Sequence, residues 1–349
     1  MKTHLVQFAL TSIVVVALSA CGGGGGGSTT PPVTTPSLTF QNIVNSIASF
    51  SYPSSVDSLA AASAVSSIRQ GAGDGLLAQS NPLDQAANSH TAYLVNNSLV
   101  ASSVYLTSTI GGELGAHYEV NTYPGYTGTT PQARATAAGY AGTVTENISF
   151  GTASGADCVT SQEDSVYHLA ALLSPFINVG ISFNAGNGTG SSCTIELGIP
   201  STTLGQLPAS GIVMYPYSGQ VSVPPTFYNQ AEIPNPATDL SSAGHPVAVS
   251  LYTQLTPSLS GSDIVIHTYS MTTGINPVSP VSARVLANSG VTSTGPTLTT
   301  DNAINGAGFV VLLPVAPLTP NTVYTVTFSA TVKGTAVSKS WSFTTGNAN

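Results

Sequence analysis

The segment SVYHLAALLSPFINVGIS, residues 165–182, places one histidine among apolar residues and one serine close to it. Ser165 stands three residues before His168, and a hydroxyl beside an imidazole is the pair that a serine nucleophile and its base require. The same spacing at the start of a helix is typical of a serine N-cap, which accepts hydrogen bonds from free backbone N–H groups. We therefore expect Ser165 to cap a helix. A lone histidine such as His168 is usually a hydrogen-bonded core residue, and a ligand role is the alternative.

Two cysteines, Cys158 and Cys193, follow a third at Cys21 near the start of the chain. In an oxidising compartment an even pair favours a disulfide, which the chain-entropy model values at roughly 3–4 kcal/mol for a loop of this length. Two buried thiols are the alternative. Two cysteines alone do not indicate a metal site.

The first twenty residues, MKTHLVQFALTSIVVVALSA, combine Lys2 with an apolar run and a small-residue exit, which predicts an export signal over residues 1–20. The stretch LSAC resembles the lipobox of bacterial lipoproteins, which implies cleavage before Cys21 and its acylation. Gly22 stands where lipoproteins retained in the inner membrane typically have Asp, which favours the outer membrane as the final location. Outer-membrane lipid would then be a partner through the acylated Cys21. Plain secretion with a free Cys21 is the alternative. Residues 21–39, rich in Gly, Thr and Pro, predict a flexible tether.

The composition excludes one large class of partner. Lys and Arg number 6 against 14 Asp and Glu, so no basic patch could follow nucleic-acid phosphates. Only 6% of residues are charged and 42% are hydrophobic, which suits a folded extracytoplasmic protein with a polar, uncharged surface.

The elements that position these residues change type along the chain. Helical spacing followed by a β-rich hairpin predicts layered α+β structure in a first domain, residues 40–200. Its predicted helices are 56–70, 82–97, 156–163 and one from Ser165 to Ser174, its extended stretch is 145–151, and its hairpin joins 176–184 to 192–199.

A Pro-rich stretch, residues 201–240, predicts an irregular connector, and residues 241–349 show only strands between turns, which predicts a β-sandwich. The ending LTPNTVYTVTFSATVKGTAVSKSWSFTTG resembles bacterial Ig-like domains. Such modules serve as spacers or binding surfaces.

Four pieces of the first domain form an ordered set: AANSHTAYL (86–94), GAHYE (115–119), ARATAAGYAGTVTENISFG (133–151) and the segment at 165–182. In this order they resemble the CAP superfamily, also called the cysteine-rich secretory protein or SCP domain, in its bacterial secreted branch. The resemblance covers residues 40–200. It implies an α-β-α sandwich, so the fold class is expected to be α+β, with a CAP-type sandwich followed by a separate all-β Ig-like sandwich.

The resemblance also implies a cleft lined by two histidines and two acidic residues that can hold zinc or another divalent metal. Residue by residue, His117, Glu146 and His168 match three of these positions, and Asp157 lies nearest the fourth, with Glu163 and Asp164 as alternatives. Two imidazoles and a carboxylate are suitable zinc ligands and leave a position open for water.

Each of these residues has a structural alternative. His168 and Glu146 can simply hydrogen-bond as a buried link between layers, and His117 can be an exposed loop residue. His90, where the family often has a histidine, is expected to be structural. His245 and His267 lie among strand residues, and no role is assigned to them.

Three functions follow as hypotheses. The first is a surface-anchored binding module whose His/Glu cleft takes a small ligand, such as a lipid, or a metal, with surface proteins as further partners. The second is a metal-dependent hydrolase of envelope or host polymers, with Glu146 as its general base. The third is an adhesive or structural protein in which the Ig-like domain binds. The binding module is the reading that the resemblance favours, and an enzyme is the less expected outcome.

Overall fold

The computed structural model describes most of the chain after the predicted tether. The predicted signal and nearly all of the tether, with the acylation candidate Cys21, lie outside the described residues. Residues 39–349 form one compact unit. None of the helices in the described ranges is long and apolar enough to cross a membrane. The described ranges are 38–52, 56–110, 113–186, 188, 190–274, 279–304 and 306–347.

Two long helices appear where the apolar spacing predicts them, α1 (Val56–Ala72) and α2 (Asn81–Asn96). Both bury a stripe of small and apolar side chains, and α2 starts with Pro82 in its first turn, where a missing N–H costs nothing. The shorter helices are η1 (Leu99–Ala101), α3 (Ser103–Thr107), η2 (Gly115–His117), α4 (Pro131–Ala137), α5 (Gly155–Glu163) and α6 (Tyr167–Leu172).

A four-stranded sheet forms the centre of the first half, in the order β2-β6-β7-β5. The predicted hairpin is confirmed, because β6 pairs antiparallel with β7. Strand β7 is buried along most of its length, which places polar residues such as Glu196 inside the protein. The bounds are β2 (Ala78–Gln79), β5 (Gly142–Phe150), β6 (Asn178–Asn184) and β7 (Ser192–Pro200).

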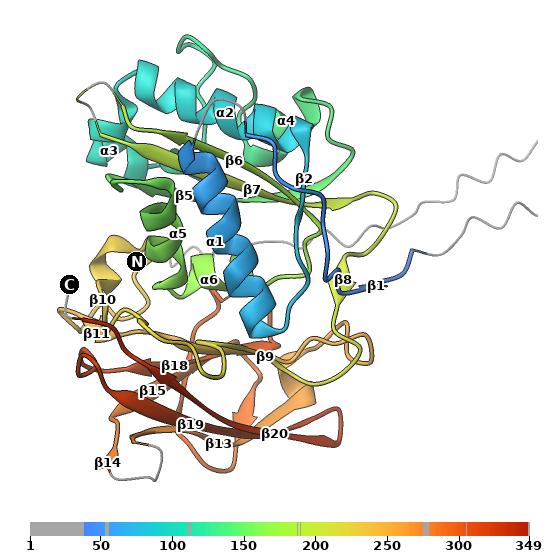
Figure 1. The fold of residues 1–349 in the computed structure, drawn as a ribbon, viewed down its shortest axis with the longest axis vertical. Coiled ribbons are helices and arrows are strands. Elements are labelled where there is room, and N and C mark those ends of the chain that lie inside the picture. Colours follow the sequence, from blue (N-terminus) through green and yellow to red (C-terminus); the bar gives the residue numbers. More distant parts are fainter. Residues whose placement is uncertain are drawn as a thin grey trace, which may run out of the picture. The chain divides into compact units, whose positions relative to one another are not determined.

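Helices cover both faces of this sheet. Helices α2 and α4 lie on one face and α1, α5 and α6 on the other, which gives three layers (Figure 1). The α+β prediction for this half is therefore confirmed at the level of its layers.

The second half is the predicted all-β region, built from two sheets in the orders β17-β15-β18-β12-β9 and β14-β13-β19-β20, with β16 paired to β13. The strands expected between turns in residues 241–349 form. The first sheet also takes β9 from the stretch predicted to be an irregular connector, where it pairs with β12. The bounds are β9 (Val213–Tyr215), β12 (Val247–Ser250), β13 (Ile264–Thr273), β14 (Ser279–Pro280), β15 (Ala283–Ala287), β16 (Thr292–Ser293), β17 (Leu298–Thr300), β18 (Phe309–Pro314), β19 (Val323–Val332) and β20 (Thr335–Thr344).

The sequence suggests a separate β-sandwich, but the two halves share a core and the sandwich is not a separate body. The side chains of β18 alternate between two cores. Val310 and Leu312 face the sandwich sheet that contains β13 and β19. Val311 and Leu313 join a cluster with Val65 of α1 and with residues of α5 and α6, below the four-stranded sheet of the first half. A strand that is apolar on both faces reads as a continuous apolar run, which is what GFVVLLPV shows.

Short paired segments complete the fold. Strand β1 (Gln41–Asn42) pairs with β8 (Gln206–Leu207), β3 (Thr109–Ile110) with β4 (Glu113–Leu114), and β10 (Thr226–Phe227) with β11 (Ala243–Gly244). Two 3-10 turns, η3 (Asn229–Ala231) and η4 (Gly261–Asp263), lie in the second half.

The start of α6 corrects one expectation. Ser165 is not its N-cap, because its hydroxyl donates to the carbonyl of Gln162 at 2.7 Å. The free N–H groups of Val166 and Tyr167 instead donate to the carboxylate of Glu232, at 2.8 and 2.7 Å. A side chain more than sixty residues away thus caps this helix, and local spacing holds no sign of it.

Candidate functional site

Six ionisable side chains meet between the sheet and the helices α2 and α4, and we call them the charge cluster. Five of them are buried, and only His117 is partly exposed, with 20% of its side chain accessible. The members are His90 of α2, His117 at the end of η2, Glu119 just after it, Arg134 of α4, Glu146 of β5 and Glu196 of β7.

Arg134 is the only cation of the cluster that carries its charge permanently. Its Nη2 donates to Glu146 Oε2 at 2.6 Å and its Nη1 to the carbonyl of His117 at 3.0 Å, while its Nε lies 3.8 Å from Glu119 Oε1. Burial lowers the pKa of Arg134, but the charges of Glu146, Glu196 and Glu119 more than compensate and raise it.

The two carboxyls that face each other across the β5–β7 pair take opposite protonation states. Burial raises the pKa of Glu146, but Arg134, His90 and His117 outweigh it, so the net pKa lies well below its usual range. Its partner Glu196 stands directly opposite in the strand register. Burial and the Glu146 charge raise the pKa of Glu196 well above its usual range, against the opposing effect of Arg134. These surroundings favour the ionised form of Glu146 and shift Glu196 toward its neutral form.

Both histidines of the cluster are held by protein partners. His117 Nδ1 lies 2.7 Å from Glu146 Oε1. His90 Nδ1 lies 3.0 Å from Glu119 Oε1, and its Nε2 lies 2.8 Å from the carbonyl of Ala116. His90 is buried with a partner on each nitrogen and so has no free position to accept a substrate proton, whereas His117 is partly exposed.

Glu119 connects the cluster to the surface. Its Oε2 accepts the backbone N–H groups of Thr127 at 2.7 Å and Gly128 at 3.3 Å, and its own N–H donates to the carbonyl of Thr129 at 3.0 Å. Burial raises the pKa of Glu119, but the hydrogen bonds from His90 and Thr127 outweigh burial. The net pKa is lowered, so Glu119 is ionised. The carboxylate therefore closes the loop of residues 119–128 at its base.

The residues expected to form a metal site separate into two places. His117 and Glu146 are in contact, as the resemblance implies. His168 lies elsewhere, with its Nδ1 3.1 Å from Glu232 Oε1 and 3.3 Å from the Ser165 hydroxyl. Asp157 lies on the exposed surface in the first turn of α5, where its carboxylate accepts a hydrogen bond from the hydroxyl of the N-cap residue Ser154 at 2.8 Å.

The alternatives for the fourth ligand do not join the cluster either. Asp164 Oδ1 lies 2.8 Å from Nδ1 of the buried His245, and burial raises the pKa of Glu163. Among the described residues, no group of three or more His, Cys, Asp or Glu side chains is placed to hold a metal ion. The donors present therefore do not fit a zinc centre, and zinc binding by His117, Glu146 and His168 stays a prediction.

Sequence reasoning missed four members of the real cluster as a group, although parts of their signal are visible. Arg134 and His90 stand in the motif pieces, and Glu119 follows His117 by two residues. Glu196 interrupts a buried strand, TIELGI, and a single acid inside an apolar strand indicates a buried partner.

A small cleft opens beside the cluster, between α2 and α4. It has a volume of about 130 Å³ and is lined by Gln85, Ala86, Ser89, Thr127, Arg134, Ala137 and Ala138. Its polar side chains are the amide of Gln85 and the hydroxyls of Ser89 and Thr127, because the guanidinium of Arg134 is fully buried in the cluster. Thr127 belongs to the loop that Glu119 closes, so the cluster shapes one wall of the cleft.

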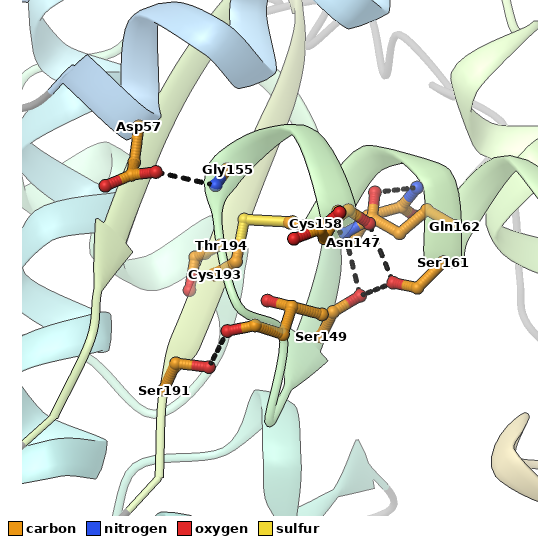
Figure 2. Close-up of a disulfide and its surroundings, with 12 residues drawn as sticks. Asp57, Asn147, Ser149, Gly155, Cys158, Ser161, Gln162, Ser191, Cys193 and Thr194 are labelled. Atoms are coloured by element: carbon orange, nitrogen blue, oxygen red, sulfur yellow. Dashed lines mark hydrogen bonds between the residues drawn. A yellow bond between two sulfur atoms is a disulfide. The ribbon is translucent and has the colours of Figure 1, made fainter.

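The predicted disulfide is confirmed and lies on the other side of the sheet. Cys158 of α5 is bonded to Cys193 of β7, next to a polar group that includes Asn147, Ser149 and Gln162 (Figure 2). Asn147 donates to Gln162 Oε1 at 3.2 Å and to the carbonyl of His168 at 3.0 Å. The covalent link fixes α5 to β7, and the hydrogen bonds of Asn147 fix α5 and α6 to β5, the strand that carries Glu146.

The comparisons with known proteins identify the second half. A family model described as a bacterial Ig-like domain matches residues 254–345. Domains of this kind are typical of extracellular or surface proteins. No family model of the CAP superfamily matches the chain. No curated protein matches it either.

Proposed function

We propose that the chain is an extracytoplasmic binding module, with a CAP-type first half joined to the Ig-like half, that holds a ligand without turning it over. The three layers and the order of the motif pieces on α2, η2, α4, β5 and α6 support the CAP assignment. An acylated Cys21 and the tether after it would hold this module at the outer membrane.

The observation that carries the proposal is that the acid and base groups are already occupied. Glu146 is held by Arg134 and His117, and His168 by Glu232. A general base must lie within hydrogen-bond reach of the substrate proton, and Glu146, whose side chain is fully buried with internal partners on both oxygens, does not. The arrangement favours a structural role for the cluster, which shapes a binding surface, over the hydrolase alternative.

The volume of the cleft limits the size of the ligand that it can hold. Pockets that enclose drug-sized or lipid ligands usually measure about 300–1,000 Å³. A volume of about 130 Å³ is close to the engineered apolar cavity of ~150 Å³ that takes a single six-membered ring. With Gln85, Ser89 and Arg134 in its wall, the cleft suits one small polar ring or end group rather than an acyl chain.

Retention and turnover can be measured on the same sample. The full-length chain is incubated with peptidoglycan sacculi, with chitin and with phosphatidylcholine vesicles, and both sedimentation with the probe and release of soluble fragments are recorded. We expect retention on at least one probe and no fragment release. Release that is lost in Glu146→Gln would overturn the proposal in favour of a hydrolase.

A second variant keeps this test interpretable, because Glu146→Gln also weakens a buried pair. His117→Ala removes a partly exposed imidazole and leaves the Glu146–Arg134 contact in place. A hydrolase that uses His117 would lose fragment release in this variant while its thermal unfolding midpoint stays close to that of the wild type. A binding module would keep its retention.

Zinc titration calorimetry tests the metal alternative separately. We expect no stoichiometric zinc binding by the full-length chain, since His168 is directed to Glu232 and away from the charge cluster. Stoichiometric binding that the double variant His117→Ala, His168→Ala loses would show that the two histidines approach each other in solution, and would restore the metal site.

A further inference from the structure

The loop closed by Glu119, residues 119–128, carries two exposed tyrosines, and we call it the tyrosine loop. Glu119 fixes both of its ends through the N–H groups of Thr127 and Gly128. Its tip is held by Asn97, whose amide donates to the carbonyl of Pro124 at 2.9 Å. The next residue, Gly125, has a φ of 81°, which only glycine adopts without strain. Loops whose ends are close and which are packed in this way are frequently functional.

The first exposed tyrosine is oriented by two others beneath it. The ring of Tyr123 packs edge-to-face on Tyr93, with centroids 6.2 Å apart, and on Tyr105, with centroids 6.4 Å apart. These two are themselves fixed, because Tyr93 Oη accepts the N–H of Val120 at 2.9 Å and Tyr105 donates to the carbonyl of Tyr118. Tyr123 is nevertheless 39% exposed, as is Tyr126.

The exposed surface of the tyrosine loop is polar but carries no charge. Residues 121–127, NTYPGYT, are all exposed and offer amide and hydroxyl groups beside the two rings. The single acid of the loop, Glu119, is buried. A fixed aromatic ring beside neutral hydrogen-bonding groups binds at low entropic cost, because little order has to be gained on contact.

We propose that the tyrosine loop binds a neutral polysaccharide, with pyranose rings packed on Tyr123 and Tyr126. A pyranose presents a face of C–H groups that matches the apolar face of a tyrosine, and its hydroxyls hydrogen-bond to groups such as those of Asn121 and Thr122. This inference rests on the proposed binding function and names its ligand class.

The exposed area and the charge argue against other occupants. The two rings together expose on the order of 150 Å², taking a tyrosine surface of about 200 Å². A stable protein partner covers about 800 Å² on each side and needs an apolar centre. Nucleic acid would need cations, and residues 120–130 contain none. One or two sugar rings fit both the area and the neutrality.

The cleft lies next to this surface. Thr127, which directly follows Tyr126 in the chain, belongs to the tyrosine loop and also lines the cleft between α2 and α4. A polysaccharide on the tyrosines can therefore place one terminal ring or substituent in the cleft, where Gln85 and Ser89 offer an amide and a hydroxyl for hydrogen bonds.

The proposal is tested by affinity electrophoresis of the full-length chain in gels that contain a soluble neutral glucan, a soluble neutral xylan or heparin, together with sedimentation on cellulose and on chitin. We expect retention by at least one neutral polysaccharide and none by heparin. The double variant Tyr123→Ala, Tyr126→Ala should lose at least tenfold in apparent affinity. The variant Tyr123→Phe, Tyr126→Phe keeps the rings and should retain most of the binding.

The matched control is Tyr228→Ala, which removes a tyrosine that is 55% exposed outside the tyrosine loop and should leave retention unchanged. Equal retention by the double alanine variant would overturn the role of the tyrosine loop. Retention on sacculi or vesicles without retention on any neutral polysaccharide would overturn the ligand class and leave the binding module intact. No retention on any probe would overturn both proposals.

Discussion

The two halves of the chain stabilise their interiors by different means. The Ig-like half is filled by aliphatic and aromatic side chains, such as Val326, Phe328 and Trp341, that alternate along paired strands. The first half adds to its apolar core a buried set of charges around Arg134 and Glu146. An apolar core tolerates loss of a partner gradually, whereas a buried charge that loses its partner is strongly destabilising. In the charged half this cluster also shapes a cleft and fixes a surface loop.

The largest effect should come from removing the cation of the charge cluster. Arg134→Met leaves the ionised Glu146 and Glu119 buried without compensation, and we expect a loss of about 3–5 kcal/mol in the free energy of unfolding, measured with urea. The control is Arg284→Met, which breaks a pair with the largely exposed Asp239 and should leave the urea midpoint almost unchanged.

A double variant sharpens this result. Arg134→Met combined with Glu146→Leu removes both members of the buried pair, and it should be more stable than Arg134→Met alone, because no uncompensated charge is left from that pair. If the single variant were as stable as the wild type, the contrast between a charged core and an apolar core would be wrong.

The disulfide should have the next largest effect. Cys158 and Cys193 are separated by 35 residues, and in the chain-entropy model a loop of this length stabilises the folded state by about 3–4 kcal/mol. We expect the double variant Cys158→Ala, Cys193→Ala to lose about this amount in urea unfolding. The Ig-like half contains no cysteine and serves as the internal reference. An unchanged midpoint would show that the three layers are held by packing alone.

The contact between the halves should respond to pH through His245. Burial lowers the pKa of His245 from 6.5 to about 4. Between these values the unfolded chain takes up a proton and the folded chain does not, so this contribution is fully present above pH 6.5 and is lost as the pH falls to about 4. The shift corresponds to about 3 kcal/mol.

The buried acids near His245 oppose this slope, so the measurement has to be a difference. Burial and the Glu232 charge raise the pKa of Asp164, which stabilises the folded state toward low pH. Comparison with His245→Asn, whose amide can still contact Asp164, isolates the histidine. The stability advantage of the wild type over this variant should shrink from pH 6.5 to pH 4, and a constant advantage would contradict a buried neutral imidazole.

The two halves also differ in how much of their structure could be predicted from the sequence. Alternating apolar residues in TVYTVTFSATV fix a half-buried strand locally, so the strands of the Ig-like half were predictable, as were α1, α2 and the β6–β7 hairpin. The pairing of His117 with Glu146 was predictable only through a family resemblance. The pairing of His168 with Glu232 was not, because the two residues lie 64 positions apart and no local pattern links them.

The tyrosine loop is a second example of a structure that local sequence patterns predict only in part. The letters YEVNTYPGYTG predict a turn at Pro124-Gly125 but do not reveal that Glu119 is buried and closes the loop. That role depends on His90 and Arg134, which approach from two other helices. Long-range electrostatic partners, rather than local propensity, decide where this half can bind.

The smallest expected effect is also the cleanest test of the comparison. Ile195 of β7 and Ile266 of β13 are both fully buried in paired strands, one in the apolar layer on the sheet face opposite the charge cluster and one in the apolar sandwich. Replacing either with valine removes one methylene, which typically costs about 0.5–1.5 kcal/mol. Equal losses for Ile195→Val and Ile266→Val in urea unfolding would mean that the apolar packing of the two halves is equivalent and that their difference lies in the charges alone. A clearly smaller loss for Ile195→Val would mean instead that the apolar packing on this face of β7 is looser than the packing around β13.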